Sequence, residues 1–398
     1  MSASPVLVRL QDLADINPSI RVSPASDEIV SFLPMSAVDA EQVDAVNTET
    51  RQFNEVSKGY TPFLRDDVLV AKITPCFENG KIAQAKPTRR LGFGSTEFHV
   101  VRPHVDRLDA RYLVHFLRQE RIRKDGERRM TGSAGQRRVP AHFLANLGVP
   151  LPSLPEQRRI AAILDKADAL RAKRRSALAQ LDTLTQSIFL DMFGDPATKP
   201  KGWPVVSIAD ICEVKGGKRL PKGEEYSSVP TPFRYIRVLD LKGGRVDESA
   251  LVYLKPEIQA AIARYVVNTG DVIISIAGSI GLVAPVPESL DGVNLTENVA
   301  KLVPRRSERY EAEYLARFLQ TDHAQGQIGS HIGQVTIGKL ALFRIEKIKV
   351  PLPPIDLQRG FVRRAAEVGL RAAAQREARS RLDDLFASLQ HRAFRGEL

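Results

Sequence analysis

Val149-Pro-Leu-Pro-Ser-Leu-Pro-Glu-Gln-Arg158 marks a change in the character of the sequence. Its prolines disfavour regular helix, but neither glycine nor proline follows the last of them until Gly194. Ser153 and Glu156 have the spacing of a capping box, in which each side chain satisfies a free backbone amide at a helix start. The pattern therefore predicts one long helix that begins within this stretch and ends near Phe193.

A second copy of the stretch follows about 200 residues later, as Val350-Pro-Leu-Pro-Pro-Ile-Asp-Leu-Gln-Arg359. Other landmarks recur in the same order at nearly the same spacing. They are Leu10–Asp15 with Ile208–Glu213, Asp67–Val70 with Asp271–Ile274, Thr96-Glu97 with Thr296-Glu297, and Leu181-Asp182 with Leu382-Asp383. Chance similarity does not preserve order and spacing at so many points, so the sequence predicts a tandem duplication. One departure is Leu357, which stands where the first copy has Glu156.

Each copy begins with a region rich in glycine, proline and short β-type runs, such as Val68–Ala71 and Val272–Ile276. Apolar residues at helical spacing predict helices over 110–123 and 311–320 within these regions. The fold class is therefore α+β. Four parts are predicted, namely a globular domain over 1–152, a central spacer helix over 153–195, a second globular domain over 196–352 and a C-terminal spacer helix over 353–398.

Both predicted long helices carry apolar residues at a spacing of three and four, which is typical of a coiled coil. The residues expected to pack are Ile160, Ile163, Leu170, Leu181, Leu184 and Ile188 in the first helix, and Phe361, Val368, Leu382, Leu385 and Leu389 in the second. Arg174 and Gln375 interrupt the two stripes at equivalent places. A helix ~58 Å long, at ~1.5 Å per residue, exceeds the width of a domain, so its stripe needs a long partner.

The second helix is the obvious partner of the first. Helix one ends at the second domain and helix two starts there, so the pair is predicted to run antiparallel. The expected object has pseudo-two-fold symmetry, with two similar domains separated by the two helices. The alternative is two unrelated bundles, each folded onto its own domain.

This arrangement resembles the specificity subunit of type I restriction-modification systems. Its most specific parts are Pro150–Ile163, Phe193–Pro196 and Phe394–Leu398. The resemblance implies that each domain is a target recognition domain reading one half of a bipartite double-stranded DNA sequence, with the helices setting the gap. It also implies two methyltransferase subunits and restriction (motor-nuclease) subunits as partners. A specificity subunit is non-catalytic and has no cofactor of its own, with S-adenosylmethionine expected on the methyltransferase.

Composition agrees with a polyanion partner. The chain has 58 Lys plus Arg against 47 acids and a formal charge of +11, which favours phosphate attraction and counterion release. No apolar run approaches the ~20 residues of a membrane span, and no secretory signal is recognised, so the cytoplasm is expected. Cys76 and Cys212 lack the clustered ligands of a zinc site and are interpreted as packing residues.

Motifs for catalysis are incomplete. Asn17-Pro18 continues as Ser-Ile rather than the Pro-aromatic pair of an adenine methyltransferase. The segment Gly333–Lys339 is followed by Leu340, where a phosphate-binding loop needs Ser or Thr. Glu213-Val-Lys215 has nuclease-like spacing but no companion acid in a convincing context. Catalytic and metal-binding residues are therefore not expected, and a stand-alone nuclease with an unrecognised site, or a scaffold binding protein or RNA, are the alternatives to DNA reading.

DNA contact requires basic, amide and hydroxyl groups on exposed loops. The segment Arg118–Arg138 contains eight cations against three acids and ends in a small, polar loop. The candidates are Asn79, Lys81, Arg128, Arg129, Gln136, Arg137 and Arg138 in the first copy, and Lys215, Lys218, Arg219, Gln334 and Lys339 in the second. Gln136 and Gln334 suit adenine and Arg137 suits guanine. A solvated charged face, or a hairpin turn at Asn79 and Lys81, is the alternative.

Overall fold

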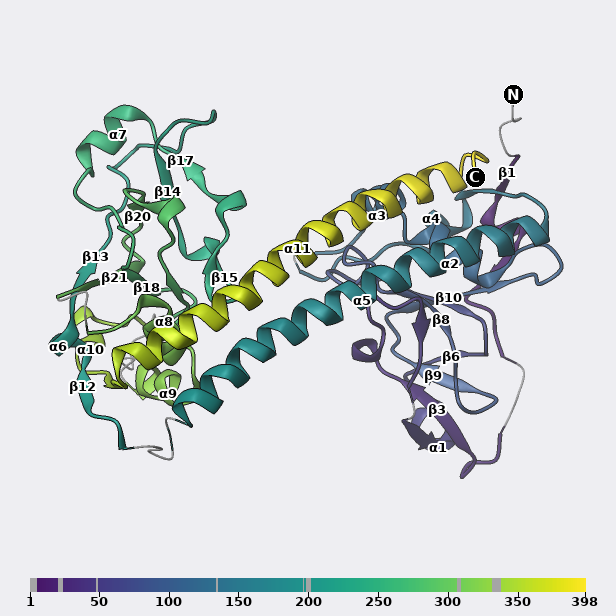
Figure 1. Ribbon diagram of the computed structural model, residues 1–398. Coiled ribbons are helices and arrows are strands. Elements are labelled where there is room, and N and C mark those ends of the chain that lie inside the picture. The colour runs from purple at the N-terminus through teal and green to yellow at the C-terminus, as the bar shows by residue number, and fades with distance from the viewer. Residues whose placement is uncertain are drawn as a thin grey trace. The chain divides into compact units, whose positions relative to one another are not determined.

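The computed structural model describes residues 6–20, 24–47, 49–133, 135–195, 197, 202–305, 309–330 and 338–398. The chain divides into two compact units, Met1–Ala177 with Gln375–Leu398, and Leu178–Ala374. Each unit contains one α+β domain together with parts of two long helices, α5 (Leu154–Phe193) and α11 (Ile355–Ala393) (Figure 1). The predicted fold class, a duplicated α+β domain with two long helices, is confirmed.

The domain of the first unit is built on two main sheets. A five-stranded sheet has the order β2 (Ala14–Ile16), β10 (Phe98–Pro103), β7 (Val68–Ala71), β8 (Ile82–Ala85) and β4 (Asp44–Ala45). A four-stranded sheet has the order β5 (Thr50–Gln52), β3 (Ile29–Leu33), β9 (Gly92–Gly94) and β6 (Thr61–Phe63). A separate antiparallel pair joins β1 (Leu7–Arg9) to β11 (Gly148–Pro150), so the segment leading into α5 is fixed to the start of the domain.

Three helices follow the sheets of the first domain, namely α2 (Ala110–Leu117), α3 (Glu120–Arg128) and α4 (Ala141–Ala145). The sequence predicted one helix over 110–123, but the structure breaks it at Arg118. The amide of Gln119 donates to the Phe116 carbonyl, and the next helix starts at Glu120. A short helix, α1 (Phe53–Val56), precedes them. The buried face of α2 joins Val68 and Val70 in the main core.

The second domain repeats this plan. A four-stranded sheet has the order β13 (Cys212–Gly216), β21 (Val299–Pro304), β18 (Val272–Ser275) and β19 (Val283–Pro285). Smaller sheets join β17 (Val252–Tyr253), β14 (Arg234–Ile236) and β20 (Asn294–Leu295), then β15 (Leu241–Lys242) and β16 (Arg245–Val246), then β12 (Val205–Ser207) and β22 (Lys349–Pro351). The helices are α6 (Ile208–Ile211), α7 (Pro256–Ala261), α8 (Ala312–Leu319), α9 (Asp322–Ser330) and α10 (Leu342–Ile345).

In each unit, the two long helices pack against one another with opposite directions. In the first unit, Arg171 Nε contacts Asp383 Oδ1 at 2.6 Å, and Arg159 Nη2 donates to the Leu398 carbonyl at 2.8 Å. The pairing therefore advances along α5 as it retreats along α11. In the second unit, the rings of Phe189 and Phe361 pack with centroids 5.5 Å apart.

The last residues of each helix complete the domain that the other helix leaves. Phe394, directly after α11, packs on Tyr112 and Phe116 of α2, with centroids 5.1 and 5.4 Å away. Phe193 of α5 packs on Tyr314 of α8 in the same way, at 4.7 Å. The alternative of two bundles, each folded only onto its own domain, is therefore wrong.

The predicted stripe is wrong at three leucines. Leu170, Leu184 and Leu385 are 51%, 43% and 50% exposed. Ile160, Phe361 and Val368 are buried, and Ile163, Leu181, Ile188, Leu382 and Leu389 are half-buried. On α5 the buried positions instead include Leu164 and Phe189. Leu164 packs into the core of the first domain and Phe189 into the core of the second, because α5 must contact a domain as well as α11. That demand rotates the buried face away from a simple two-helix stripe.

Candidate nucleic-acid interface

The basic segment 118–138 is divided by the fold into structural and exposed cations. Arg118 donates to the Ala40 carbonyl, and Arg123 Nη1 donates to the Glu78 carbonyl at 2.5 Å. Arg137 Nη2 donates to the Glu127 carbonyl at 2.7 Å. These guanidinium groups hold loops and helix ends in place. Fewer cations are therefore available to a ligand than the eight in the sequence of this segment.

The exposed cations of this segment gather on α3. Arg121, Lys124, Arg128 and Arg129 line an open groove of about 570 Å³ that also borders α4. Lys124 pairs with Glu120 at 2.7 Å and Arg129 with Asp125 at 3.2 Å. Of the four, Arg128 and Arg129 are among the candidates from the sequence, whereas Arg121 and Lys124 were counted only as cations of the basic segment. Their helical spacing of three and four along the same segment was the signal that they share a face.

The loop that follows α3 is fixed by Arg138. This arginine forms a two-pronged contact with Glu97, at 2.7 Å from Nη2 to Oε1 and 3.0 Å from Nε to Oε2. Its third nitrogen, Nη1, donates to the Gln136 carbonyl at 3.1 Å. The hydrogen bond from Arg138 lowers the pKa of Glu97. Arg138 is therefore a positioning residue, and it leaves the side chain of Gln136 exposed at the loop.

Two candidates lie in the turn between β7 and β8. Lys81 Nζ donates to the Met35 carbonyl at 3.0 Å, so its ammonium group is used within the domain. Asn79 is exposed, and its backbone amide donates to the Pro75 carbonyl at 3.0 Å. Asn79 and Lys81 are thus parts of an ordered turn, of which only Asn79 presents its side chain outward.

In the second domain, three candidates cluster at the end of β13 and directly after it. Lys215 pairs with Glu213 at 2.8 Å, and Arg219 Nε donates to Glu297 Oε1 at 2.6 Å. Lys218 is exposed and lies 5.8 Å from the centre of the Tyr265 ring. Lys215 lies in β13, and Lys218 and Arg219 lie on the loop that follows it, so these predicted residues are neighbours along one segment.

The remaining two candidates differ in what the structure describes. Gln334 lies outside the described residues. Lys339 is exposed, and its backbone bridges to Ala277 next to the end of β18. Most of Gly333–Lys339, the incomplete phosphate-loop motif of the sequence, also lies outside the described residues.

The exposed basic face of α3 is not repeated on the equivalent helix of the second domain. The equivalent helix, α9, has the sequence Asp-His-Ala-Gln-Gly-Gln-Ile-Gly-Ser and contains neither Lys nor Arg. The two domains therefore share a scaffold but differ in charge at this helix.

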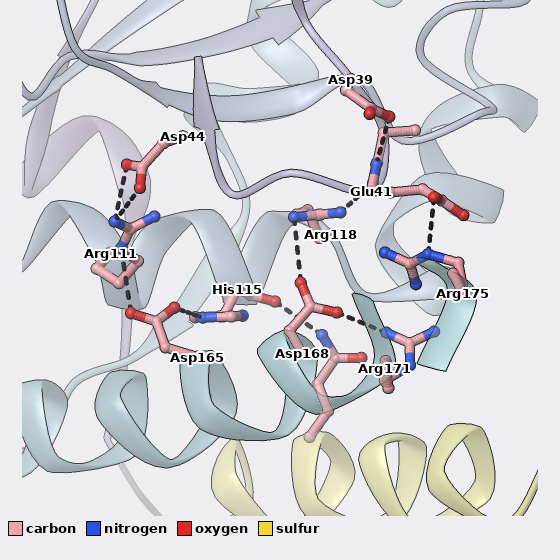
Figure 2. Close-up of polar contacts among 12 residues, drawn as sticks. Asp39, Glu41, Asp44, Arg111, His115, Arg118, Asp165, Asp168, Arg171 and Arg175 are labelled. Carbon is pink, nitrogen blue, oxygen red and sulfur yellow. Dashed lines mark hydrogen bonds and ion pairs between the residues drawn. The ribbon is translucent and has the colours of Figure 1, made fainter. Parts of the chain in front are cut away.

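A buried ionic network attaches α5 to the first domain (Figure 2). Arg118, directly after α2, points at Asp168 of α5, with 3.8 Å from Nη1 to Oδ2, and Asp168 Oδ1 accepts from Arg171 at 2.8 Å. Burial lowers the pKa of Arg118, while the Asp168 carboxylate opposes that shift. Removing one partner of such a group would leave a charge unpaired in the interior, which costs several kcal/mol.

The same network continues one turn earlier along α5. Arg111 Nη2 contacts both oxygens of Asp44, at 2.7 and 2.8 Å, and its Nε lies 3.4 Å from Asp165. His115, which is buried, shares that carboxylate through Nε2 at 2.7 Å (Figure 2). These residues were not singled out from the sequence, because their partners are distant along the chain. They fix the direction in which α5 leaves the domain.

Among the described residues, no group of three or more His, Cys, Asp or Glu side chains is placed to hold a metal ion. Within the same residues, no helix has both the length and the apolar character needed to cross a membrane. Cys212 is fully buried, and burial raises the pKa of its thiol to about 11.

The chain belongs to the family of type I restriction-modification DNA specificity proteins. The family profile described as type I restriction modification DNA specificity domain matches residues 8–180 and 200–364, one match for each domain, and it extends over most of α5 but only the start of α11.

Curated relatives from Escherichia coli are similar over part of the chain. The type I restriction enzyme EcoAI specificity subunit is 43% identical over 152 residues, which is 38% of this chain and 26% of the relative. The EcoEI specificity subunit is 41% identical over 160 residues, covering 40% and 27%. The EcoBI specificity subunit is 25% identical over 300 residues, covering 67% and 62%. The chain thus spans about a quarter of the length of the first two relatives.

Solved structures show the same fold along the whole chain. One comes from work on complex assembly and conformational transition of the type I R-M system. It has a TM-score of 0.57 and 21% identity, and the match covers 100% of this chain and 99% of that one. The type I restriction-modification system S subunit from M. genitalium has a TM-score of 0.54 and 16% identity, covering 99% and 97%. At these identities the likeness is one of fold.

Proposed function

We propose that this chain is a specificity subunit that reads a bipartite double-stranded DNA sequence, one half with each domain. The observation that carries the proposal is the duplication itself. The same scaffold occurs twice, and each copy presents its own set of exposed polar and basic side chains on the surface. Two related but different surfaces suit two different half-sites, since base readout depends on the side chains and not on the scaffold.

The long helices serve as the spacer between half-sites in this proposal. The ionic network around Arg118 and Asp168 supports that role, because it fixes α5 to the first domain at several points. A spacer sets a distance only if it cannot pivot where it leaves the domain.

The long helices also dock partner subunits. Leu170, Leu184 and Leu385 are exposed, and so is Leu370, at 74%. Single exposed leucines are common on protein surfaces, so membership of the family, and not the exposure alone, supports an interface on these helices. We assign them to two methyltransferase subunits, which would bind S-adenosylmethionine and perform the chemistry, with restriction subunits added for cleavage. The chain itself would be non-catalytic and act in the cytoplasm.

Footprinting tests the proposal directly. The full chain, assembled with its methyltransferase subunits, should protect two short segments of duplex DNA separated by a constant gap. Protection of one continuous site would contradict the bipartite reading. Cleavage or methylation of DNA by the purified chain alone would instead establish a stand-alone enzyme, and binding only to RNA or protein would establish a scaffold.

A further inference from the structure

The acid of the repeated Thr-Glu pair holds an arginine in both domains. In the first domain, Glu97 binds Arg138 from the loop after α3. In the second domain, Glu297 binds Arg219 from the loop after β13. The two arginines come from different loops and do not occupy equivalent positions in the duplication. The two glutamates do occupy equivalent positions. The position at the entrance to β10 and β21 is therefore used twice to hold a guanidinium group at the surface.

The two arginines differ in what remains available to a ligand. All three guanidinium nitrogens of Arg138 are used, two by Glu97 and one by the Gln136 carbonyl. Arg219 contacts Glu297 only through Nε, and its side chain is 78% exposed. Within the described part of the chain, neither terminal nitrogen of Arg219 has a hydrogen-bond partner. Its Nη1 and Nη2 thus form a free pair of donors.

The carboxylate that holds Arg219 is itself fixed. Glu297 Oε1 accepts from Arg219, and Glu297 Oε2 accepts from Thr296 Oγ1 at 2.9 Å. Burial raises the pKa of Glu297, but the hydrogen bonds from Arg219 and Thr296 outweigh it, so the pKa is lowered overall. The carboxylate therefore stays ionised and keeps its hold on the guanidinium group at neutral pH.

The backbone that carries Arg219 is fixed as well. The amide of Lys218 donates to the Leu295 carbonyl at 2.8 Å, and the Lys218 carbonyl accepts from Tyr235 Oη at 2.8 Å. Gly217 lies so close to the neighbouring strand that a Cβ atom there would be 2.2 Å from the Thr296 carbonyl oxygen. A side chain held at both its backbone and its guanidinium group loses little further freedom on binding.

Arg219 lies at an open groove of the second domain. The groove has a volume of about 650 Å³, and Tyr226, Leu239, Glu297 and Asn298 contribute to its lining. Leu239 is 73% exposed and Tyr226 is 41% exposed, so the groove offers apolar contact beside its donors. Base edges in a DNA major groove present this mixture, with acceptors on guanine and a methyl group on thymine.

We propose that Arg219 reads a guanine in the half-site of the second domain, with Glu297 as its positioning residue. The terminal nitrogens donate to guanine O6 and N7, which is the geometry of a two-pronged arginine contact. The inference rests on the proposed function and adds the residue and base by which one half-site is read.

Selection from a library of random DNA duplexes tests the inference. The full chain, in complex with its methyltransferase subunits, is compared with R219A, R219K and E297Q variants. Lys242→Ala is the matched control, because Lys242 is 61% exposed and paired with Asp247 but does not line the groove. Thermal unfolding of each variant checks that the domain remains folded.

The expected result is a loss confined to one base pair. R219A should lower the preference for guanine at one position of one half-site by roughly 5- to 150-fold, leaving the other half-site unchanged. R219K keeps the charge but not the fork, so it should also lose that preference. E297Q should weaken the preference at the same position, and K242A should leave every position unchanged.

Other outcomes separate the two proposals. Equal loss of affinity for all sequences in R219A would make Arg219 a phosphate contact and overturn the inference. An E297Q variant with unaltered preference would overturn the positioning role. A wild-type complex that selects no sequence at all would instead contradict the proposed function.

Discussion

Gln157 Oε1 accepts a hydrogen bond from the Asp109 amide at 2.8 Å, and this contact joins the first turn of α5 to the first turn of α2. The amide nitrogen of the same side chain donates to the carbonyls of Arg107 and Pro152, both at 2.9 Å. Gln358 repeats the arrangement in the second domain, where its Oε1 accepts from Glu311 N at 2.9 Å. The glutamine that follows each proline cluster is therefore a buried clamp between helix and domain.

Replacing this glutamine should destabilise the unit that contains it. Gln157→Ala removes the buried partner of the Asp109 amide and of the Arg107 and Pro152 carbonyl groups, and each of these groups that stays buried and unsatisfied costs ~1–3 kcal/mol. Chemical denaturation of the full chain should show the loss. Gln180→Ala, at an exposed position of α5, is the control and should have little effect. Equal stability of both variants would mean that water replaces the clamp.

Phe394 is expected to hold the end of α11 on the first domain. Phe394→Ala removes a buried ring that packs on Tyr112 and Phe116, and such a change typically costs ~3–5 kcal/mol. Amide hydrogen exchange over residues 375–398 should become faster. Leu385→Ala removes an exposed side chain from the same helix, and it should leave exchange nearly unchanged. Unchanged exchange in the Phe394 variant would contradict the docking role.

His99 should make the stability of the first domain depend on pH. The ring is buried, its Nε2 lies 2.8 Å from the Val139 carbonyl and its Nδ1 lies 3.1 Å from Asn17 Nδ2. These partners fit the neutral ring with the proton on Nε2. Burial lowers the pKa of His99 below its ordinary 6.5. The unfolded chain therefore binds the proton more readily, and stability should fall as the pH drops from 6.5 toward the lowered pKa.

Thermal unfolding as a function of pH measures this effect. His99→Gln keeps one donor and one acceptor but cannot titrate, so the decline of stability below pH 6.5 should become shallower. His104→Gln is the matched control, since His104 is exposed and pairs with Asp15. If stability declines as steeply in the His99 variant as in the unaltered chain, groups other than His99 cause the pH dependence.

Shortening both long helices should shorten the gap between half-sites. Deleting Leu178–Leu184 and Val368–Ala374 together removes one heptad from each helix and keeps its periodicity. The deletion in α5 begins after Arg175, whose ion pair with Glu41 of the first domain, at 2.8 Å, is therefore kept. The gap should shrink by about three base pairs, from ~10.5 Å of helix and 3.4 Å per DNA step. Footprinting that shows the same distance between the two protected DNA segments after the deletion would refute the spacer role.

The duplication, the two long helices and the α+β class could be predicted from the sequence. Each of these depends on local pattern. The proline cluster, the long interval before Gly194 and the second copy at Val350 are all visible without knowing any partner. Helix length follows from the absence of breakers, because backbone hydrogen bonds in a helix connect residues only four apart.

The surface chemistry needed the tertiary structure. Arg118, Arg137 and Arg138 look the same in the sequence as Arg121 and Arg128, but the first three are bound by groups brought near by folding. The buried face of α5 also changed, with Leu164 inside and Leu170 outside, because the helix must pack on a domain and on α11 at once. A side chain's role depends on contacts between residues far apart in the chain, and only the folded backbone brings those residues together.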